Sequence, residues 1–490
     1  MSLSEVEFAY FFPAFFLLYW VLPRRAAVQN WALCAGSLFF YATWNLKLVP
    51  LFVASTLVDF AILRGFEKFA APQDGSPLPT DERNQKRRRA LLTLGIVHNL
   101  TALAAFKYAG FFADSFNQAF GTSLPVLRLA LPVGLSFYTM GRIGVLIDTY
   151  YERLTPVRSL GVWFSFVSFF PQLIAGPIGR GSELFEQYEN PRKLTADAFL
   201  KAAFELATGF VLKVYIAAQV GTELVDPVFA APGTFTRKAH LLAVVGYAGQ
   251  VFADFAGYSL IAIGVGRLLG ITLPDNFQFP FLSKSLPEVW RRWHMTLNRW
   301  LFDYIYGPMV TGDSFMRGRI GAGFLVVMVA SGLWHGAAFT YLLWGLLHGL
   351  GLLAHHRYDL AYKGLCRKNR VWVERRRSTF YQVAGWMVTT VFFILTLIPF
   401  RAPTLAAAGK FARGLWAGGN LPNPPGTFHP YLALLLVVIY HVGALPVFEG
   451  FRKRASATPL AMKGLALGAV IVFLMLFAPV GAGTFIYAQF

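Results

Sequence analysis

The chain has 490 residues, of which 56% are hydrophobic, 16% aromatic and only 14% charged, whereas soluble domains carry roughly 25% charged residues. One or two water-soluble cores could not cover its 48 phenylalanines without leaving large exposed apolar patches. Composition therefore excludes an ordinary soluble protein. Apolar runs of about 20 residues, the length that crosses ~30 Å of hydrocarbon, recur from end to end and predict an all-α polytopic membrane protein.

The placement of the basic residues argues against nucleic acid as a partner, despite a net charge of +19. The runs RNQKRRR (83–89), RKNRVWVERRR (367–377) and FRKR (451–454) each lie between apolar segments. This is the positive-inside pattern of cytoplasmic loops in membrane proteins. We therefore expect the lipid bilayer, and no nucleic acid, as a partner; the runs could also attract anionic lipid or a polyanionic substrate.

The first predicted span covers residues 8–22. Its acidic start and the following PRR (23–25) favour an N-terminus outside the cytoplasm, and no basic leader of a signal peptide precedes it. Further spans are predicted at 31–45, 48–66, 91–113, 126–147, 160–178, 196–219, 240–270, 319–334, 338–356, 380–400, 429–447 and 461–480. If the three basic runs are inside, the last span leaves the C-terminus outside as well, so both termini are expected in the periplasm.

Two polar segments interrupt the spans, APQDGSPLPTDERNQ (71–85) and GNLPNPPGTFHP (419–430), and both read as loops. Neither separates soluble domains, and no repeat of two halves is visible. We therefore expect residues 1–490 to form a single integral-membrane domain. Cys34 and Cys366 show no CxxC or metal-ligand spacing, so no disulfide framework is predicted.

The segment FFPQLIAGPIGRG (169–181) does not fit a simple span, because Pro171, Gly176 and Pro177 interrupt its apolar run. A helix broken there must satisfy its freed backbone groups inside protein or along a water-lined cavity. Two interpretations stay open. The segment is either a re-entrant or interrupted element that lines a site, or an ordinary helix end.

The segment EVWRRWHMTLNRWLFDYIY (288–306) is predicted to form one amphipathic helix at the membrane interface or partly within the protein. At the helical period, an apolar stripe contains Trp290, Trp293, His294, Leu297, Leu301 and Tyr304. The opposite side contains Arg291, Arg292, Arg299 and Asp303. His294 therefore belongs to the apolar side rather than to the arginines.

His294 and His335 both follow a tryptophan on an apolar face and are separated by 41 positions, which is enough chain to bring them together. Burial disfavours the charged imidazolium, so both rings are expected to be neutral. A neutral imidazole can accept the proton of a hydroxyl nucleophile, a role worth roughly 10²–10⁴ in rate. The alternative is a buried histidine that donates to a backbone carbonyl and takes part in no chemistry.

His348 lies 13 residues beyond His335, about 220° around a continuous helix, so the two are not expected to share a metal ion. No metal-binding or nucleophile motif such as HExxH or GxSxG is present, and no metal site is predicted. Asp254, within YAGQVFADFAGYS (247–259), is an acid in an apolar run. It is expected either to face the bundle interior and orient a histidine or arginine, or to sit at a solvated helix end.

Six ordered motifs resemble segments of the membrane-bound O-acyltransferases. Within that family the chain is most similar to the bacterial branch of the alginate O-acetyltransferase membrane subunit and the D-alanyl-teichoic-acid acyltransferase. The motifs are FKYAGFF (106–112), LPVGLSFYT (131–139), FFPQLIAGPIGR (169–180), QVFADFAGYS (250–259), WRRWHMTLNRWLFDYIY (290–306) and SGLWHGAAFTYLLWGLLHG (331–349). The resemblance is strongest over residues 100–350. It departs from the usual pattern at Asn298, where serine is common, at GPMVTG (307–312) and at MGRIGVLIDTYY (140–151).

The resemblance implies a ring of tilted transmembrane helices around a central tunnel, with re-entrant and interfacial helices, a core at about 100–360 and peripheral helices at 1–70 and 380–490. It implies that His335 is the active-site histidine, as general base or transient acyl carrier, and that His294 is a second functional histidine. The other residues expected at the substrate or along the tunnel are Gln250, Asp254, Tyr258, Arg291, Arg292, Trp293, Asn298 and Trp334.

The function implied by the resemblance is an inner-membrane acyltransferase. It would take acetyl from cytoplasmic acetyl-CoA, with no permanently bound cofactor, and pass it to a periplasmic partner of the SGNH type with Ser-His-Asp chemistry. The acceptor would be an exopolysaccharide such as alginate or cellulose, or peptidoglycan; a teichoic-acid role would call for a carrier-protein donor. The alternatives are a polysaccharide or lipid transporter and a non-catalytic membrane subunit of a polysaccharide synthase.

Overall fold

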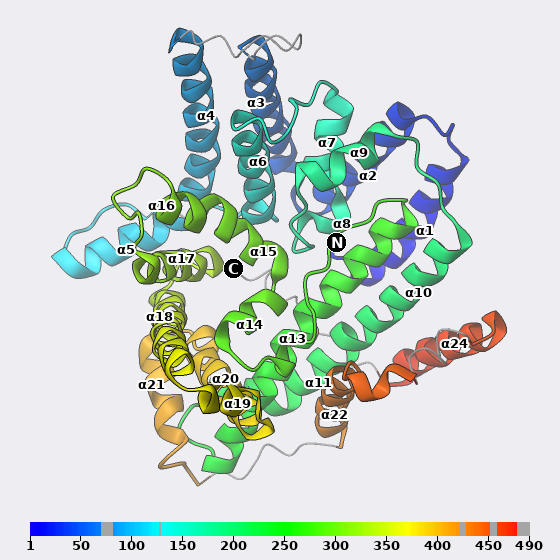
Figure 1. Ribbon diagram of the computed structural model, residues 1–490. Coiled ribbons are helices and arrows are strands. Elements are labelled where there is room, and N and C mark those ends of the chain that lie inside the picture. The colour runs from blue at the N-terminus through cyan, green and yellow to red at the C-terminus, as the bar shows by residue number, and fades with distance from the viewer. Residues whose placement is uncertain (70–81, 127–128, 421–427, 451–457, 478–490) are drawn as a thin grey trace. The chain divides into compact units, whose positions relative to one another are not determined.

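A computed structural model describes residues 1–69, 82–126, 129–420, 428–450 and 458–477 (Figure 1). Within these ranges the regular structure is helical, with no β-strand. The chain divides into two compact units, residues 1–205 with 261–274 and residues 206–260 with 275–490. The predicted all-α class is confirmed for the described residues.

The first unit contains α1 (Val6–Val21), α2 (Ala26–Asn45), α3 (Val49–Lys68), α4 (Glu82–Leu103), α5 (Ala109–Phe120), α6 (Leu135–Tyr150), α7 (Leu160–Ser168), α8 (Phe170–Leu173), α9 (Gly181–Glu189) and most of α10 (Ala196–Phe210). A π-helical turn, Ala104–Tyr108, joins α4 to α5. Helices α3, α4 and α6 pack side by side (Figure 1).

The second unit begins with a helical stretch made of a π-helical turn (Val211–Ala217), α11 (Ala218–Val220), a second π-helical turn (Gly221–Val225) and α12 (Asp226–Ala230). There follow α13 (Arg237–Leu268), α14 (Leu286–Arg292), α15 (Met295–Leu301), a π-helical turn (Phe302–Tyr306), α16 (Gly307–Thr311), α17 (Ile320–His335), α18 (Phe339–Lys368), α19 (Arg370–Arg377), α20 (Thr379–Arg401), α21 (Leu405–Gly414), α22 (His429–Val442) and α24 (Leu460–Phe477). The last residues of α13 belong to the first unit.

Several helical runs are long and apolar enough to cross a membrane, which confirms a multi-pass membrane protein. They are Ala26–Lys68, Glu82–Phe120, Arg237–Leu268, Thr379–Arg401 and Leu460–Phe477. Other predicted spans are shorter helices, among them α17 with 16 residues. A helix of that length rises about 24 Å, less than the ~30 Å of hydrocarbon, so protein rather than lipid must satisfy at least one of its ends.

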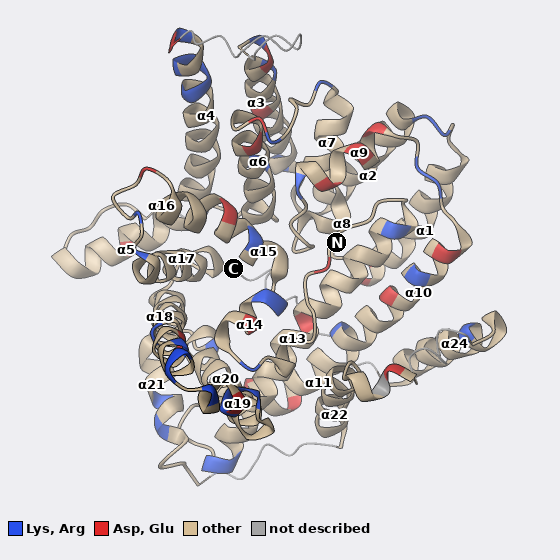
Figure 2. Cartoon of the chain, in the orientation of Figure 1, with Lys and Arg blue, Asp and Glu red and all other residues tan. Residues whose placement is uncertain are grey.

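The basic runs are helical rather than loops, which corrects the expectation for two of them. Residues 83–89 form the first turns of α4, where Lys86 pairs with Glu82 at 3.2 Å. Residues 367–377 divide between the end of α18 and α19, where Lys and Arg gather (Figure 2). Arg, Lys and Glu favour helices, and helical periodicity does not require apolar residues. The run 451–454 lies outside the described residues, as do most of the segments 71–85 and 419–430.

Residues 169–181 do not form one continuous helix, in agreement with both interpretations of this segment. Helix α7 ends at Ser168, α8 has only four residues, and no regular structure follows until α9.

The start of α6 is fixed by a glycine. The Leu173 carbonyl oxygen would lie 2.1 Å from a Cβ at Gly134, whose φ of +71° also favours glycine. Gly134 precedes α6, so this helix begins at residue 135 rather than near 126 as predicted.

A buried ionic cluster joins α3, α4 and α6. The Arg142 guanidinium lies 3.6 Å from an Asp59 carboxylate oxygen and donates to the Ser55 hydroxyl at 2.7 Å. Asp59 also accepts from the Asn99 amide at 2.9 Å, and the guanidinium lies over the Tyr138 ring at 4.6 Å. Buried charges are tolerated when they are paired and hydrogen-bonded in this way, so the cluster ties three helices together.

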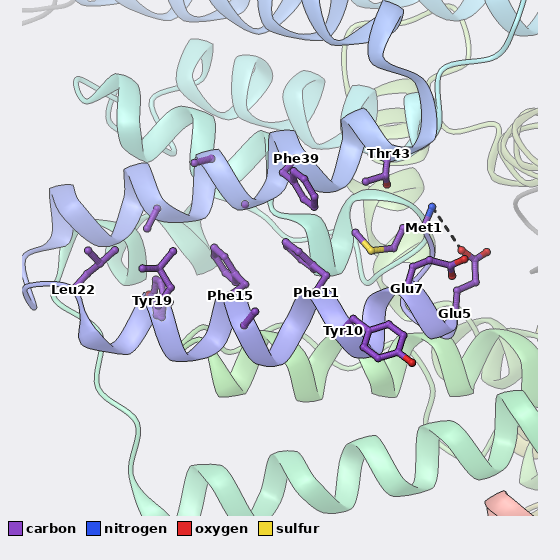
Figure 3. Close-up of a pocket in the computed structure, with 15 residues that line it drawn as sticks. Met1, Glu5, Glu7, Tyr10, Phe11, Phe15, Tyr19, Leu22, Phe39 and Thr43 are labelled. Atoms are coloured by element: carbon purple, nitrogen blue, oxygen red, sulfur yellow. Dashed lines mark ion pairs between the residues drawn. The ribbon is translucent and has the colours of Figure 1, made fainter.

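An apolar groove of about 970 Å³ runs between α1 and α2 (Figure 3). Phe11, Phe15 and Phe39 line its length, and the Met1 ammonium lies 3.6 Å from Glu5 at one end. None of the residues predicted to act on a substrate lines this groove. The candidate site therefore has to be sought in the second unit.

Helices α17 and α18 approach each other closely through glycines. A Cβ at Gly345 would lie 2.3 Å from the Met328 carbonyl oxygen, and one at Gly332 would lie 2.2 Å from the Tyr341 carbonyl oxygen. Small residues at a helix interface allow such close backbone contact in membranes. This contact fixes the position of His335 at the end of α17.

We predict that Gly345→Ala lowers the thermal unfolding midpoint of the detergent-solubilised protein, because overpacking costs about 1–3 kcal/mol. Gly364→Ala is the matched control on the same helix, since its added methyl meets no atom within 4 Å. It should leave the midpoint unchanged or raise it, because alanine favours helix over glycine. Equal midpoints for the two variants would contradict the close packing of α17 on α18.

Candidate functional site

The segment predicted as one helix over 288–306 breaks at His294. Helix α14 ends at Arg292 and α15 begins at Met295. His294 adopts φ 43° and ψ 53°, a left-handed conformation that is uncommon for residues other than glycine. The prediction of a single helix is wrong, but His294 and Leu297 are buried as the stripe predicted.

Backbone hydrogen bonds from residues 276–278 stabilise this break. The Gln278 N–H donates to the Arg292 carbonyl at 2.9 Å, and the Met295 N–H donates to the Asn276 carbonyl at 2.9 Å. Backbone groups that lose their helical partners inside an apolar protein need new ones. The loop before α14 supplies them, which explains why the helix stops here.

The Asn276 side chain holds the His294 ring. Its Oδ1 lies 3.0 Å from His294 Nδ1 and accepts from the Thr296 hydroxyl at 2.9 Å. The Phe255 ring of α13 lies perpendicular to the imidazole at 4.6 Å. His294 is 1% exposed, and its Nε2 has no hydrogen-bond partner among the described residues. Asn276 therefore holds Nδ1 of the ring, whereas Nε2 is buried without a hydrogen-bond partner among the described residues.

His335 is the last residue of α17 and lies in an aromatic cage. Its ring centroid is 5.1 Å from that of Trp344 in α18 and 5.2 Å from that of Phe400 in α20. The side chain is only 3% exposed. The dry apolar setting expected for this imidazole is therefore present, and three helices build it.

Trp334 lies between the two predicted histidines. Its ring is 5.6 Å from the His294 ring and 4.9 Å from the His335 ring. The structure thus brings His294 and His335 to the same indole, although α14, α15 and α17 carry them separately. Trp334 is itself buried, as expected for a residue between two sheltered imidazoles.

A third imidazole, His348, extends the cluster from α18. Its ring lies 4.8 Å from Trp344 and 5.1 Å from Trp290, and its Nε2 lies 3.0 Å from the Thr396 hydroxyl. Because the chain turns between α17 and α18, His348 shares Trp344 with His335 instead of lying on the same helix. The described part of the chain contains no group of three or more His, Cys, Asp or Glu side chains placed to hold a metal ion.

A cavity of about 490 Å³ adjoins α14 and α15. Arg291, Asn298 and Arg299 line it; both arginines are exposed and Asn298 is half-buried. The other lining residues are Pro287, Trp290, Met295, Phe302, Tyr306, Phe324, Val327, Met328 and Leu352. Apolar walls with a few charged groups are typical of ligand sites.

Gln250, Asp254 and Tyr258 follow each other at a spacing of four along α13 and so share one face. Asp254 is buried as one of its interpretations predicted, but its ion-pair partner is Lys213 rather than a histidine or arginine. Lys213 lies on the π-helical turn before α11. A lysine inside an apolar run is a signal of a buried charge, and the sequence analysis missed Lys213.

Other predicted residues make contacts that hold α14 in place. Arg292 pairs with Glu288 at 2.9 Å and donates to the Gln278 carbonyl at 3.3 Å. The Trp293 ring packs on Phe277 at 5.2 Å. In this structure Arg292 therefore anchors α14 to the preceding loop, and Trp293 packs against that loop.

Asn276 and Thr396 are site residues that the sequence analysis did not find. Asn276 stands in the polar stretch PDNFQF (274–279), which lacks a periodic pattern. Asn276 lies 18 positions before His294, so no local signal in the sequence links the two residues. Thr396 lies within an apolar predicted span, where a single threonine does not indicate a functional site.

Comparison with known proteins gives two findings. A family model described as MBOAT, membrane-bound O-acyltransferase family, matches residues 150–398. A protein named "Probable alginate O-acetylase AlgI" from Azotobacter vinelandii is 35% identical over 94% of this chain and 87% of its own length.

Two further relatives carry different names. A "Peptidoglycan O-acetyltransferase" from Helicobacter pylori is 32% identical, over 83% of this chain and 77% of its own length. A "Teichoic acid D-alanyltransferase" from Streptococcus thermophilus is 30% identical, over 49% of this chain and 60% of its own length. All three names describe the transfer of an acyl group, acetyl in two of them and D-alanyl in the third.

We predict that Lys213→Met strongly destabilises the protein, because the carboxylate of Asp254 then loses the lysine in a buried setting; breaking such a pair costs about 3–5 kcal/mol. The thermal unfolding midpoint in detergent should fall, and the double variant K213M/D254N, which removes both charges, should recover most of the loss. Lys201→Met breaks an exposed pair with Asp197 and should have little effect. Unchanged stability of the Lys213 variant would contradict this assignment.

Proposed function

The chain belongs to the membrane-bound O-acyltransferase family and is a membrane O-acyltransferase, and we propose that it moves acetyl from cytoplasmic acetyl-CoA across the inner membrane. The final acceptor is an exopolysaccharide of the alginate or cellulose type. The observation that carries this proposal is the meeting of His294 and His335 at one buried indole, together with an arginine-lined cavity. Trp290 and Met295, from the two helices that flank His294, form part of this cavity.

The cavity suits an acyl-CoA donor. Its volume is about 490 Å³, which suits part of the donor rather than the whole molecule. Arg291 and Arg299 supply guanidinium groups, which bind phosphate in a bidentate manner. Apolar residues such as Phe324 and Met328 offer a surface for the uncharged arm of the donor.

The position of Arg291 supports a cytoplasmic entrance. His355 of α18 lies close enough to interact electrostatically with Arg291, Asp359 and Arg376. Asp359 pairs with Arg376 of α19 at 2.6 Å, so this end of α18 lies beside the basic run 367–377. The positive-inside rule places that run in the cytoplasm. This position of Arg291 supports an entrance for the donor on the side where acetyl-CoA is made.

The reaction needs a base and a dry site. A hydroxyl oxygen attacks the thioester carbonyl, the C–S bond breaks, an oxygen ester forms and the hydroxyl proton ends on the sulfur of CoA. In this direct route His335 accepts the hydroxyl proton and passes it to the CoA sulfur. In the alternative route a ring nitrogen of His335 attacks the thioester carbonyl, the C–S bond breaks and CoA leaves as the thiol; the hydroxyl oxygen then attacks the acetyl-imidazole, the C–N bond breaks and the hydroxyl proton ends on the imidazole. His294 positions the thioester or relays the proton. The aromatic cage around both rings excludes water, which would otherwise hydrolyse the thioester.

Transfer of the acetyl group to the polysaccharide requires further proteins. A periplasmic partner with Ser-His-Asp chemistry receives the acetyl group and places it on sugar hydroxyls, and both termini of this chain lie in the periplasm. The names of the relatives from Azotobacter and Helicobacter, which specify alginate and peptidoglycan, support a polysaccharide as the final acceptor. Neither name points to transport or to an inert subunit.

We predict that His335→Ala abolishes acetylation, with a loss of at least about 10²-fold because a general base or acyl carrier is removed. The measurement is the acetyl-ester content of secreted polysaccharide in cells that carry only the variant, normalised to its amount in the membrane. His98→Gln, in the first unit, is the matched control and should retain acetylation. Wild-type acetyl content with the His335 variant would refute the assignment.

The two possible roles of His335, general base and acyl carrier, can be distinguished with the same variant. If His335 carries acetyl, wild-type protein incubated with radiolabelled acetyl-CoA retains label after denaturation, and the His335→Ala variant does not. If His335 acts only as a base, neither protein retains label.

We predict that Arg291→Gln with Arg299→Gln raises the KM for acetyl-CoA about tenfold or more and changes kcat less, because these side chains contact the donor away from the reacting carbon. The assay is CoA thiol release by purified protein in liposomes. Arg317→Gln is the matched control, since Arg317 pairs with Asp313 at 3.3 Å on an exposed segment outside the cavity. An unchanged KM would show that the donor binds elsewhere.

A further inference from the structure

We propose that Asn276 is a positioning residue that holds His294 with its proton on Nδ1, and so keeps the Nε2 lone pair available to take up the acceptor's proton. This inference rests on the proposed function, in which His294 relays a proton at the acyl-transfer site. Asn276 lies in the loop before α14, and its side chain forms hydrogen bonds with His294, Thr296 and Ser259.

The contacts of Asn276 fix which atom of its amide faces the histidine. The Thr296 backbone N–H, which can only donate, lies 3.4 Å from Oδ1, and the amide Nδ2 donates to the Ser259 hydroxyl at 3.1 Å. With the amide reversed, two donors would face each other at Thr296. The oxygen therefore faces the His294 ring as well.

A carbonyl oxygen can only accept, so the ring nitrogen that faces it has to donate. His294 Nδ1 lies 3.0 Å from Asn276 Oδ1 and must therefore carry the proton. In a neutral imidazole the second nitrogen, Nε2, then holds a lone pair. That nitrogen is the buried atom without a partner among the described residues. Leaving a buried acceptor unpaired destabilises the protein, which fits a position kept for a ligand atom.

The backbone adds a second restraint on the ring. His294 is held at φ 43°, and the carbonyl of Asn276 accepts from the N–H of Met295, the next residue. Strained backbone of this kind clusters at functional sites, where the surrounding structure over-determines it. One asparagine thus fixes both the main chain and the tautomer.

An amide performs this task without favouring the charged ring. The imidazole ring of His294 contacts Asn276, Phe255 and Trp334, and none of these side chains carries charge. The elements around the ring also carry ionisable groups, and Lys213 pairs with Asp254 of α13. On α13 they are Arg237, Lys238, His240, Tyr247, Asp254, Tyr258 and Arg267; on the loop before α14, Asp275 and Lys284; on α14, α15 and the turn that follows, Glu288, Arg291, Arg292, Arg299, Asp303, Tyr304 and Tyr306; and on α17, His335. A carboxylate in place of the Asn276 amide would accept the same hydrogen bond and stabilise the imidazolium, which has no lone pair on Nε2.

The test replaces the amide by a carboxylate of nearly the same shape. For Asn276→Asp, the acetyl-transfer rate relative to wild type should rise about tenfold between about pH 6 and about pH 8, because the ring stays protonated at the lower pH. Ser259→Ala, which loosens the amide without adding charge, is the control, and its ratio to wild type should not vary with pH. A flat ratio for the aspartate variant would overturn the proposal.

A measurement on the protein with Asn276 intact covers the case in which the variants do not fold. In a difference spectrum of protein labelled with ¹⁵N-histidine, wild type minus His294→Gln, Nδ1 of His294 should give a protonated, pyrrole-type signal and Nε2 an unprotonated, pyridine-type signal. The reverse assignment, or an equal mixture, would overturn the proposal whatever the activity of the variants.

The proposed function fails in a different way. If His294→Ala transfers acetyl at the wild-type rate, His294 takes no part in the reaction, and the role given to it falls. If His294→Ala is inactive while Asn276→Asp follows the wild-type pH dependence, the role of His294 in the reaction stands and only the positioning role of Asn276 is refuted.

Discussion

The structure around the candidate site depends on the backbone hydrogen bonds between residues 276–278 and the junction of α14 and α15. A helix interrupted inside a membrane protein leaves donors and acceptors that neither lipid nor an apolar core can satisfy. Here the Arg292 carbonyl and the Met295 N–H both find partners in the preceding loop. With the ends of the break satisfied, His294 can adopt a left-handed conformation, and its ring turns inward.

The inward ring meets a dry aromatic cluster. Trp334 touches both His294 and His335, while Trp344 touches both His335 and His348. Glycine contacts between α17 and α18 bring the two helices close enough for this arrangement. Each hydrogen bond counts for more in such a setting, because no water competes for the donor or acceptor and the local dielectric is low. The cluster therefore holds three imidazoles in a fixed, dry geometry, as the proposed acyl transfer to a hydroxyl requires.

The comparison of prediction with structure separates short-range from long-range information. A helical wheel over 288–306 placed His294 and Leu297 on the buried side correctly, because burial follows the local period. It could not show the break, because the cause is Asn276, 18 positions earlier and outside the segment. Asp254 was expected to orient a histidine or arginine, yet its partner is Lys213, which a π-helical turn aims at α13. In each case the missing information was a partner distant in sequence.

The sequence by itself determined the helical membrane class, the interruption within residues 169–181, the family resemblance and the two histidines on apolar faces, because each follows from composition, period or a local motif. Only the tertiary structure decided that the imidazoles meet at Trp334, that an amide rather than a charged group holds His294, and that α14 and α15 are separate helices. The reason is physical. Hydrophobic periodicity records which side of a segment avoids water, whereas hydrogen-bond partners and ring contacts are chosen only when distant segments pack against one another.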